Sequence, residues 1–161
     1  MESKINLDNI KKTVKEFFKK TTFEVELELK NPEENTIQVV LKMEEPQILI
    51  GQGGETLSDI QYLLKMILYK KIKEPIFIDL DINEYKKKKS EYLRQLAREL
   101  ADEVSLTKEE RMLPPMSAYE RRIIHAELSS RSDIKTESVG EEPGRRVVIK
   151  FRQNPSIFEN W

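Results

Sequence analysis

The chain has one histidine, His125, which follows Arg121 by one turn of a predicted helix. Residues four apart are neighbours on a helical face, so this Arg-x-x-x-His spacing places both side chains, with Arg122 beside them, on one polar arc. A guanidinium fits phosphate and stacks on bases, and the arginine charges should lower the pKa of a histidine among them. The pattern favours a nucleic-acid contact over a catalytic centre, although a solvated polar face has the same spacing.

Residue types that would support catalysis or metal binding are scarce. The chain has no cysteine, and no serine or aspartate is arranged to activate the single histidine, so nucleophilic catalysis has no support. Asp79, Asp81 and Glu84 carry the oxygen ligands that hard cations prefer, but carboxylates at the end of a strand are ordinarily solvated. We therefore expect a non-enzymatic protein with no catalytic residues, metal or cofactor.

A second chemical feature is the glycine-rich segment Gly51-Gln52-Gly53-Gly54, which follows Ile50. Glycine has no Cβ, so the backbone can approach a ligand closely, and the free N–H groups that open the next helix favour phosphate. The segment lacks the Gly-Lys-Ser/Thr ending of a P-loop, so nucleotide hydrolysis is unsupported. Gln52 and Gly53 are uncharged and Glu55 follows them, so the loop offers backbone donors without Coulomb attraction.

Apolar periodicity and turn residues predict the elements that must position these features. A capping box, Ser117 with Glu120, begins the helix that carries Arg121 and His125, and residues 140–144 form a hairpin loop behind it. The predicted helices are 7–20, 47–50, 55–71, 84–104 and one from Ser117, and the predicted strands are 23–29, 37–43, 76–80, 111–113, 134–139 and 145–151.

Length and charge limit the class of protein. The 161 residues suffice for one ordinary domain or two small ones. Because the formal net charge is -1, binding to nucleic acid must come from a local patch. Residues 1–82 contain no arginine, and every arginine lies at or beyond Arg94, which suggests two modules. The sequence has no apolar run of membrane-spanning length and no signal-like start, so we expect a cytoplasmic protein without membrane insertion.

The first half of the chain, about residues 1–82, resembles a type II KH domain. The resemblance rests on the order helix, strand, strand, helix, glycine loop, helix, strand, with Ile50-Gly51-Gln52-Gly53-Gly54 at the loop. It implies that the loop clamps a short stretch of single-stranded backbone. It also implies a groove for bases lined by Ile48, Leu49, Leu57 and Ile60, residues that helical spacing alone would place in the core.

The second half resembles the R-three-H domain of the Jag family, the bacterial SpoIIIJ-associated proteins, in which this domain follows a KH domain. The resemblance rests on residues 119–125 and 140–149, and on the junction at residues 79–85. It implies an α+β protein with a type II KH domain at 1–82 and an R-three-H domain of a small sheet with two helices at 83–152. From its residues, we expect the tail at 153–161 to be mobile unless its aromatic residues dock. Family members often begin with a further Jag-N domain and linker, whereas the sequence as given starts at the KH module.

We therefore predict a protein that binds single-stranded RNA, with single-stranded DNA left open, and that regulates post-transcriptional events or cell elongation and division. The predicted contacts are Ile50, Gly51, Gln52, Gly53 and Gly54 in the KH loop and Arg121, Arg122 and His125 on the Arg-x-x-x-His helix. Accessory candidates are Lys87, Arg94, Arg98, Arg145 and Arg146. The first three share a face that is more typical of a solvated, ion-paired helix, and the last two point to opposite faces of a strand.

The alternative is a protein–protein adaptor. The family resemblance implies that the KH domain pairs with a small KH-only partner, and self-association is a further option. The near-neutral net charge and the uncharged glycine loop both favour this alternative.

Overall fold

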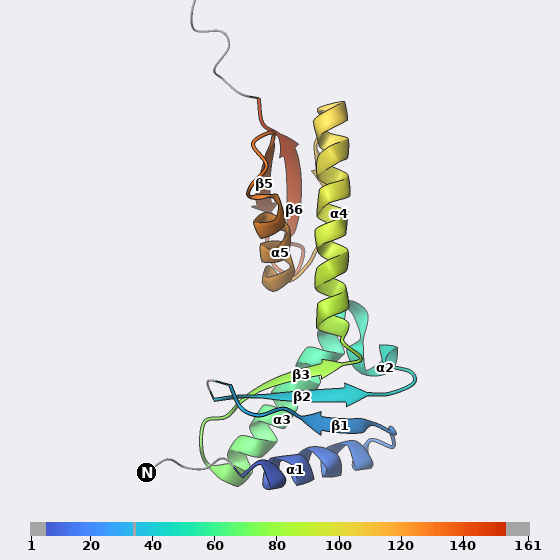
Figure 1. Ribbon diagram of the computed structural model, residues 1–161, viewed down its shortest axis with the longest axis vertical. Helices are drawn as coiled ribbons and strands as arrows, with labels where there is room; N and C mark the ends of the chain where they lie inside the picture. Colours follow the sequence, from blue (N-terminus) through green and yellow to red (C-terminus); the bar gives the residue numbers. More distant parts are fainter. Residues whose placement is uncertain (1–5, 34, 154–161) are drawn as a thin grey trace, which may run out of the picture. The chain divides into compact units, whose positions relative to one another are not determined.

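The structure is a computed structural model that describes residues 6–33 and 35–153. The expected tail at 153–161 lies outside the described residues from position 154 onward. The chain divides into two compact units, Met1–Lys86 and Lys87–Trp161, each with its own elements (Figure 1).

The first unit begins with helix α1 (Leu7–Lys20), whose bounds match the prediction. Asn6 caps it, because its side-chain oxygen accepts from the N–H groups of Asp8 and Asn9, which would otherwise lack partners. Ile10, Val14 and Phe18 recur at helical spacing and are buried. The amphipathic pattern thus determines which face of α1 packs on the core.

A three-stranded sheet runs through the same unit in the order β1-β2-β3. Strand β1 (Glu26–Leu29) is antiparallel to β2 (Thr36–Lys42), and β3 (Phe77–Ile82) is parallel to β2. A parallel pair needs a crossover connection, here α2 (Gln47–Ile50), the 3-10 turn η1 (Gln52–Gly54) and α3 (Glu55–Ile72). Strand β1 is shorter than predicted because its ladder ends where Glu26 meets Lys42, the last residue of β2.

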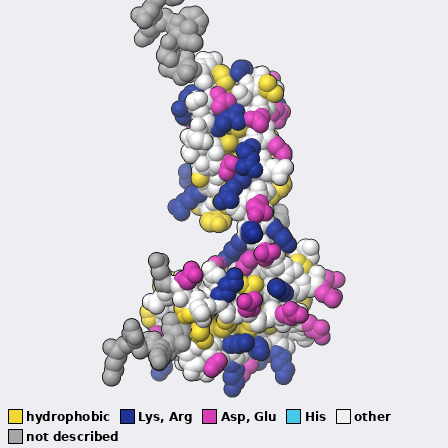
Figure 2. Space-filling model, in the orientation of Figure 1, with side chains coloured by type: hydrophobic (Ala, Val, Ile, Leu, Met, Phe, Trp, Pro, Cys, Tyr) yellow, Lys and Arg dark blue, Asp and Glu magenta, His cyan; other side chains and the backbone are white. Residues whose placement is uncertain are grey.

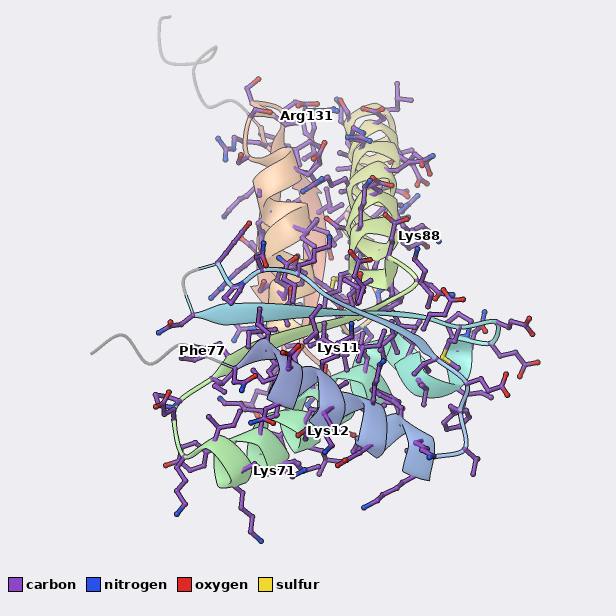
Figure 3. All side chains as sticks on the ribbon, turned by 60° about the horizontal axis from the view of Figure 1, so that its bottom comes forward. Lys11, Lys12, Lys71, Phe77, Lys88 and Arg131 are labelled. Carbon is purple, nitrogen blue, oxygen red and sulfur yellow. The ribbon has the colours of Figure 1, made fainter. Side chains whose placement is uncertain are left out.

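Helices α1 and α3 lie on the same side of this sheet (Figures 1 and 3). Near its C-terminal end, α3 is tied to α1, since Lys71 lies 3.5 Å from Glu16 and its Nζ donates to Thr13. On the other side of the sheet, Lys86 pairs with Asp79, and its backbone N–H donates to Asp81. Asp79 and Asp81, whose oxygens are of the kind that hard cations prefer, are therefore engaged with the start of the next helix.

The buried core of the first unit combines both helices with the inner face of the sheet. Its members are Ile10, Val14, Phe18, Ile37, Val39, Leu41, Leu49, Leu57, Ile60, Leu64, Leu68, Ile76, Ile78, Leu80 and Ile82.

The second unit contains most of the long helix α4 (Tyr85–Thr107), then β4 (Arg111–Met112), α5 (Ala118–Leu128), β5 (Ile134–Val139) and β6 (Arg146–Phe151). Its antiparallel sheet has the order β4-β6-β5. The helices and sheet share a separate core of Leu93, Ala97, Ala101, Val104, Leu113, Ile124, Leu128, Ile134, Val147 and Ile149.

The predicted α+β architecture is confirmed in both units. The first has the order helix, strand, strand, helix, helix, strand, and the second has a small sheet with two helices. Figure 2 shows Lys and Arg side chains interspersed with Asp and Glu on the visible face of each unit, in keeping with the near-zero net charge. Within the described ranges, no helix combines the length and apolar character needed to cross a membrane.

Candidate nucleic-acid interface

The glycine loop, Ile50 to Gly54, joins α2 to α3 and turns sharply at Gly51. This residue has φ 71° and ψ -177°, a backbone conformation that is essentially confined to glycine. A Cβ at Gly51 would lie 2.1 Å from Oγ1 of Thr56. Gly51 therefore lets the first turn of α3 pack closely against the loop. The Gly-x-x-Gly spacing did not indicate this packing role.

Gly54 and Gly53 differ in what surrounds them. Gly54 is buried with φ 84°, and a Cβ there would lie 3.2 Å from the ring of Tyr85. Gly53 has φ 61° and is exposed, and no atom lies within 4 Å of the position its Cβ would take. Of these two glycines, only Gly53 has open space beside its backbone, where a ligand could bind. Its neighbour Gln52 is also exposed.

The residues expected to line a groove for bases are mostly core. Leu49, Leu57 and Ile60 are at most 8% exposed, in line with their helical spacing. Ile48 is 53% exposed, and Ile50 is half-buried. The apolar surface beside the loop is thus formed by Ile48 and part of Ile50.

A capping box sets the start of α5. The Ser117 hydroxyl accepts from the Glu120 N–H at 3.3 Å, and the Glu120 carboxylate accepts from the Ser117 N–H at 2.8 Å. Glu120 also lies 3.6 Å from Lys89 of α4. These contacts orient the first turn of α5 and so determine where the following arginines point.

Arg121 is buried instead of lying on a solvated arc. It is 6% exposed, and its guanidinium donates to the Met116 carbonyl at 2.7 Å and pairs with Glu142 at 2.8 Å. Glu142 belongs to the turn between β5 and β6, so Arg121 ties that turn to the segment before α5. Helical spacing alone did not show this, because the acidic partner is distant in sequence.

His125 lies between two hydroxyl groups of β5. Its Nδ1 is 2.6 Å from Thr136 Oγ1 and its Nε2 is 2.8 Å from Ser138 Oγ. Burial and, secondly, the nearby Arg121 charge lower the pKa of the histidine, since both disfavour the imidazolium. The direction agrees with the sequence prediction, although burial is the larger cause. A neutral His125 donates to one hydroxyl and accepts from the other.

Arg122 and Arg145 expose their side chains. In the described part of the chain, neither makes an ion pair or a side-chain hydrogen bond. The two guanidiniums are therefore available to phosphate. Tyr119, which sequence reasoning left outside the site, is 63% exposed and precedes Arg122 by three positions on α5, so it can offer a ring to a base. The sequence feature that could have identified Tyr119 is its place as an aromatic residue beside the polar side of α5.

The remaining accessory candidates differ in how far they are engaged. Arg94 and Arg98 both contact Glu127 of α5, at 3.9 and 2.6 Å, so they pair across helices. Arg146 donates to the Gly144 carbonyl at 3.1 Å, while Lys87 is exposed.

This fold and these sites define a protein built from two nucleic-acid-binding domains. Residues 8–90 match the KH domain model and residues 91–151 match the R-three-H domain model. The KH match covers half of the chain, so the chain belongs to the KH-domain family, and the order of the two domains is that of the Jag proteins.

Several curated relatives are named RNA-binding protein KhpB. The chain is 40% identical to the one from Clostridium symbiosum over 76% of its own length and 55% of that protein. It is 36% identical to the one from Bacillus subtilis strain 168, over 73% of the chain and 58% of that protein. The protein from Streptococcus pneumoniae D39 is 31% identical over 71% of the chain and 35% of its own length. The matched region thus spans about half, or less, of each relative.

Proposed function

We propose that this chain binds single-stranded RNA without enzymatic action, through the glycine loop of the KH domain and the exposed side of α5, and that it acts in post-transcriptional regulation or in cell elongation and division. One observation carries the proposal: Arg122 and Arg145 are exposed and have no ion-pair partner in the part of the chain that the structure describes, and both lie in a domain of a nucleic-acid-binding family. The name RNA-binding protein, which the relatives bear, favours RNA over DNA.

The roles within the Arg-x-x-x-His site divide by burial. Arg122 and Arg145 contact phosphate, because their charges have no partner among the described residues. Arg145 belongs to this site because its carbonyl accepts from the N–H of Met116, just before α5, at 3.1 Å. Arg121 and His125 position the site: one holds the β5–β6 turn through Glu142, and the other holds α5 against β5. In the KH domain, the open backbone at Gln52 and Gly53 receives the nucleic-acid backbone, and Ile48 and Ile50 provide apolar contact for a base.

Salt-dependent binding of a labelled single-stranded RNA, followed by fluorescence anisotropy, tests this proposal. Losing one phosphate contact lowers the slope of log affinity against log salt by about one. We expect Arg122→Ala to lower that slope by about one and to weaken binding several-fold at low salt, and Arg145→Ala to do the same. Arg152→Ala removes another exposed arginine and serves as the matched control. Unchanged affinity and slope for Arg122→Ala and Arg145→Ala would refute the assignment of these two arginines as phosphate contacts.

The glycine loop has its own test. The double variant Gln52→Asp, Gly53→Asp places two negative charges where the nucleic-acid backbone is expected, and aspartate tolerates the left-handed conformation of Gly53 better than most residues. We expect weaker RNA binding with an unchanged circular dichroism spectrum. Gln153→Asp, at another exposed position, is the control.

The adaptor alternative, in which the KH domain pairs with a small KH-only protein, is favoured by one observation. Helix α3 exposes Tyr62, Met66 and Tyr69, an apolar surface of the kind that contacts proteins. If the Gln52→Asp, Gly53→Asp variant kept its RNA affinity but lost a protein partner, the adaptor function would be the better account.

A further inference from the structure

Helix α1 carries a row of lysines along its exposed side. At 3.6 residues per turn, these lysines lie within an arc of roughly 100° of the helix. We call them the α1 basic face: Lys11, Lys12, Lys15 and Lys19. All four side chains are exposed (Figure 3), and with Asp8 and Glu16 they line a shallow depression in the surface of the helix.

The charges of the α1 basic face have no partner within the described ranges, 6–33 and 35–153. None of its four lysines makes an ion pair or a side-chain hydrogen bond there. Glu16, at the margin of the face, lies 3.5 Å from Lys71 of α3, so its charge is already matched. Helical spacing places one acidic residue, Asp8, on the same arc. The arc is therefore strongly positive in a chain whose net charge is -1.

The stability of α1 does not account for this face. Lys11, Lys15 and Lys19 follow one another at intervals of four, and like charges at that spacing destabilise a helix slightly. Lys19 lies in the last turn of α1, where the helix dipole favours a cation. The other lysines of the face gain nothing from that position, whereas an anionic partner would offset their repulsion.

The geometry of the face fits a chain of phosphates. Four residues of helix rise about 6 Å, so Lys11, Lys15 and Lys19 present regularly spaced charges along one line. Lysine binds phosphate as a point charge. The arc holds no aromatic or amide side chain that could stack on a base or read its edge. Such a surface contacts the nucleic-acid backbone and carries no sequence information.

An anionic lipid surface is the competing partner for a basic helix. Helices that lie in a membrane interface bury an apolar face in the lipid. The apolar residues Ile10, Val14 and Phe18 of α1 are at most 1% exposed because they pack in the core. None of these three side chains is free to enter a bilayer, which favours the nucleic-acid backbone over a membrane.

The α1 basic face is separate from the glycine loop in the same domain. The loop precedes Glu55, the first residue of α3, whereas α1 contacts Lys71 near the other end of that helix. Between these two residues α3 rises about 24 Å. A KH loop clamps four nucleotides, so a strand held at both places must be longer than that.

We propose that the α1 basic face is a second RNA contact of the KH domain, which holds backbone phosphates beyond the nucleotides at the glycine loop and does so without regard to sequence. This inference rests on the proposed RNA binding and adds a site to it. Two linked contacts on one strand raise affinity when the strand spans both. The contribution of α1 therefore depends on the length of the RNA.

Fluorescence anisotropy with two labelled single-stranded RNAs, of about eight and about 30 nucleotides, tests the proposal. The α1 variant replaces three lysines of the face: Lys11→Gln, Lys15→Gln and Lys19→Gln. The control variant removes the same charge at three exposed lysines elsewhere: Lys30→Gln, Lys65→Gln and Lys108→Gln. Circular dichroism checks that both variants are folded.

We expect the α1 variant to bind the long RNA several-fold more weakly than the wild type, and the short RNA equally well. The slope of log affinity against log salt for the long RNA should fall by about two, because each contact with a single strand contributes about 0.7. The control variant should keep the wild-type preference for the long RNA. A longer strand also offers more positions for binding, so the loss in the α1 variant is the diagnostic result.

The outcomes separate this inference from the proposed function. Unchanged long-RNA affinity in the α1 variant overturns the inference, while short-RNA binding still supports the proposed function. Equal losses in the two variants would mean a general effect of charge and also overturn it. If the wild type binds the long RNA alone and the α1 variant loses it, the face is supported and the glycine-loop site is refuted. Binding of neither RNA by the wild type refutes both.

A gain of affinity provides a second test. Asp8→Asn removes the negative charge on the arc and leaves its lysines in place, so we expect it to tighten binding of the long RNA and to leave the short RNA unaffected. Glu33→Gln, at another exposed acidic residue of the same unit, is the control. Equal effects of the two substitutions, or no effect of Asp8→Asn, would contradict a phosphate contact at this face.

Vesicles of phosphatidylserine and phosphatidylcholine test the lipid alternative by cosedimentation. We expect the α1 variant and the control variant to behave alike with these vesicles. If the wild type binds them, the α1 variant alone loses that binding, and long-RNA affinity is the same in both variants, then the face is a membrane contact and the inference is overturned.

Discussion

The two side chains that define the Arg-x-x-x-His pattern act through neighbouring segments of the protein. The charge of Arg121 is matched by Glu142, and both ring nitrogens of His125 have hydroxyl partners on β5. A guanidinium that is buried and paired has little left to offer a phosphate. The exposed Arg122 is therefore better placed to bind, while Arg121 and His125 hold the surface around it.

The pKa of His125 provides a test at this scale. Burial and the Arg121 charge lower it below the usual 6.5, and as the chain's only histidine it gives unambiguous ring-proton signals in an NMR titration. Because the folded-state pKa is lowered, the stabilisation that His125 contributes is present above about pH 6.5 and is lost as pH falls through the folded value.

We expect a pKa below 6.5 for His125, a shift back toward 6.5 in Arg121→Met, and a smaller loss of unfolding free energy on acidification in His125→Gln than in the wild type. A wild-type pKa at or above 6.5 would contradict the burial of the ring.

At the scale of elements, the three glycines of the glycine loop have different structural roles. Gly51 allows Thr56 to pack and Gly54 allows Tyr85 to pack, while Gly53 faces open space. Both ends of the loop thus pack closely, one against α3 and the other against the start of α4. The exposed middle of the loop, Gln52 and Gly53, has no charged side chain.

Single alanine substitutions separate these roles. Gly51→Ala creates a clash with Thr56 and a strained backbone, so we expect it to lower the free energy of unfolding by about 3 kcal/mol or more. Gly53→Ala meets no neighbouring atom and adds only the left-handed backbone cost of about 1 kcal/mol. Urea denaturation of both variants makes the comparison. A similar loss for the two would mean that Thr56 moves aside and that Gly51 is not required by packing.

At the scale of the whole molecule, the chain builds a separate hydrophobic core in each unit. Every buried member of the first core lies between Ile10 and Ile82, and every buried member of the second lies between Leu93 and Ile149. Each unit thus has the means to fold by itself. With a net charge of -1, the proposed binding to RNA depends on local cations and not on a general field.

Core truncations test this division. Leu64 and Ile124 are both fully buried, one in each core, and cutting either to alanine should cost about 2–5 kcal/mol. We expect Leu64→Ala to speed hydrogen exchange of core amides in α3 while those of α5 keep their protection, and Ile124→Ala to do the reverse. Loss of protection in both units from either variant would show that they unfold together.

Much of this architecture could be predicted from the sequence. Apolar periodicity identified α1 and α3, the Ser117–Glu120 capping box identified the start of α5, and the turn at 140–144 identified the last hairpin. These features depend on residues close to one another in the chain, and local patterns report them directly. Strand β1 was placed too long because its end depends on the length of its partner, β2.

Local patterns along the chain thus predicted the order of elements, the fold class and the positions of both candidate binding motifs. Which side chains in those motifs lack partners among the described residues became clear from the packing of segments that are distant in sequence. In the folded protein, Arg121 is buried and pairs with Glu142. Gly51 packs against Thr56, and Gly54 packs against Tyr85. Arg122, Arg145 and Gly53 stay exposed. The physical reason is that exposure and pairing depend on which distant segments fold over a residue, and its spacing along one helix or loop carries no record of them.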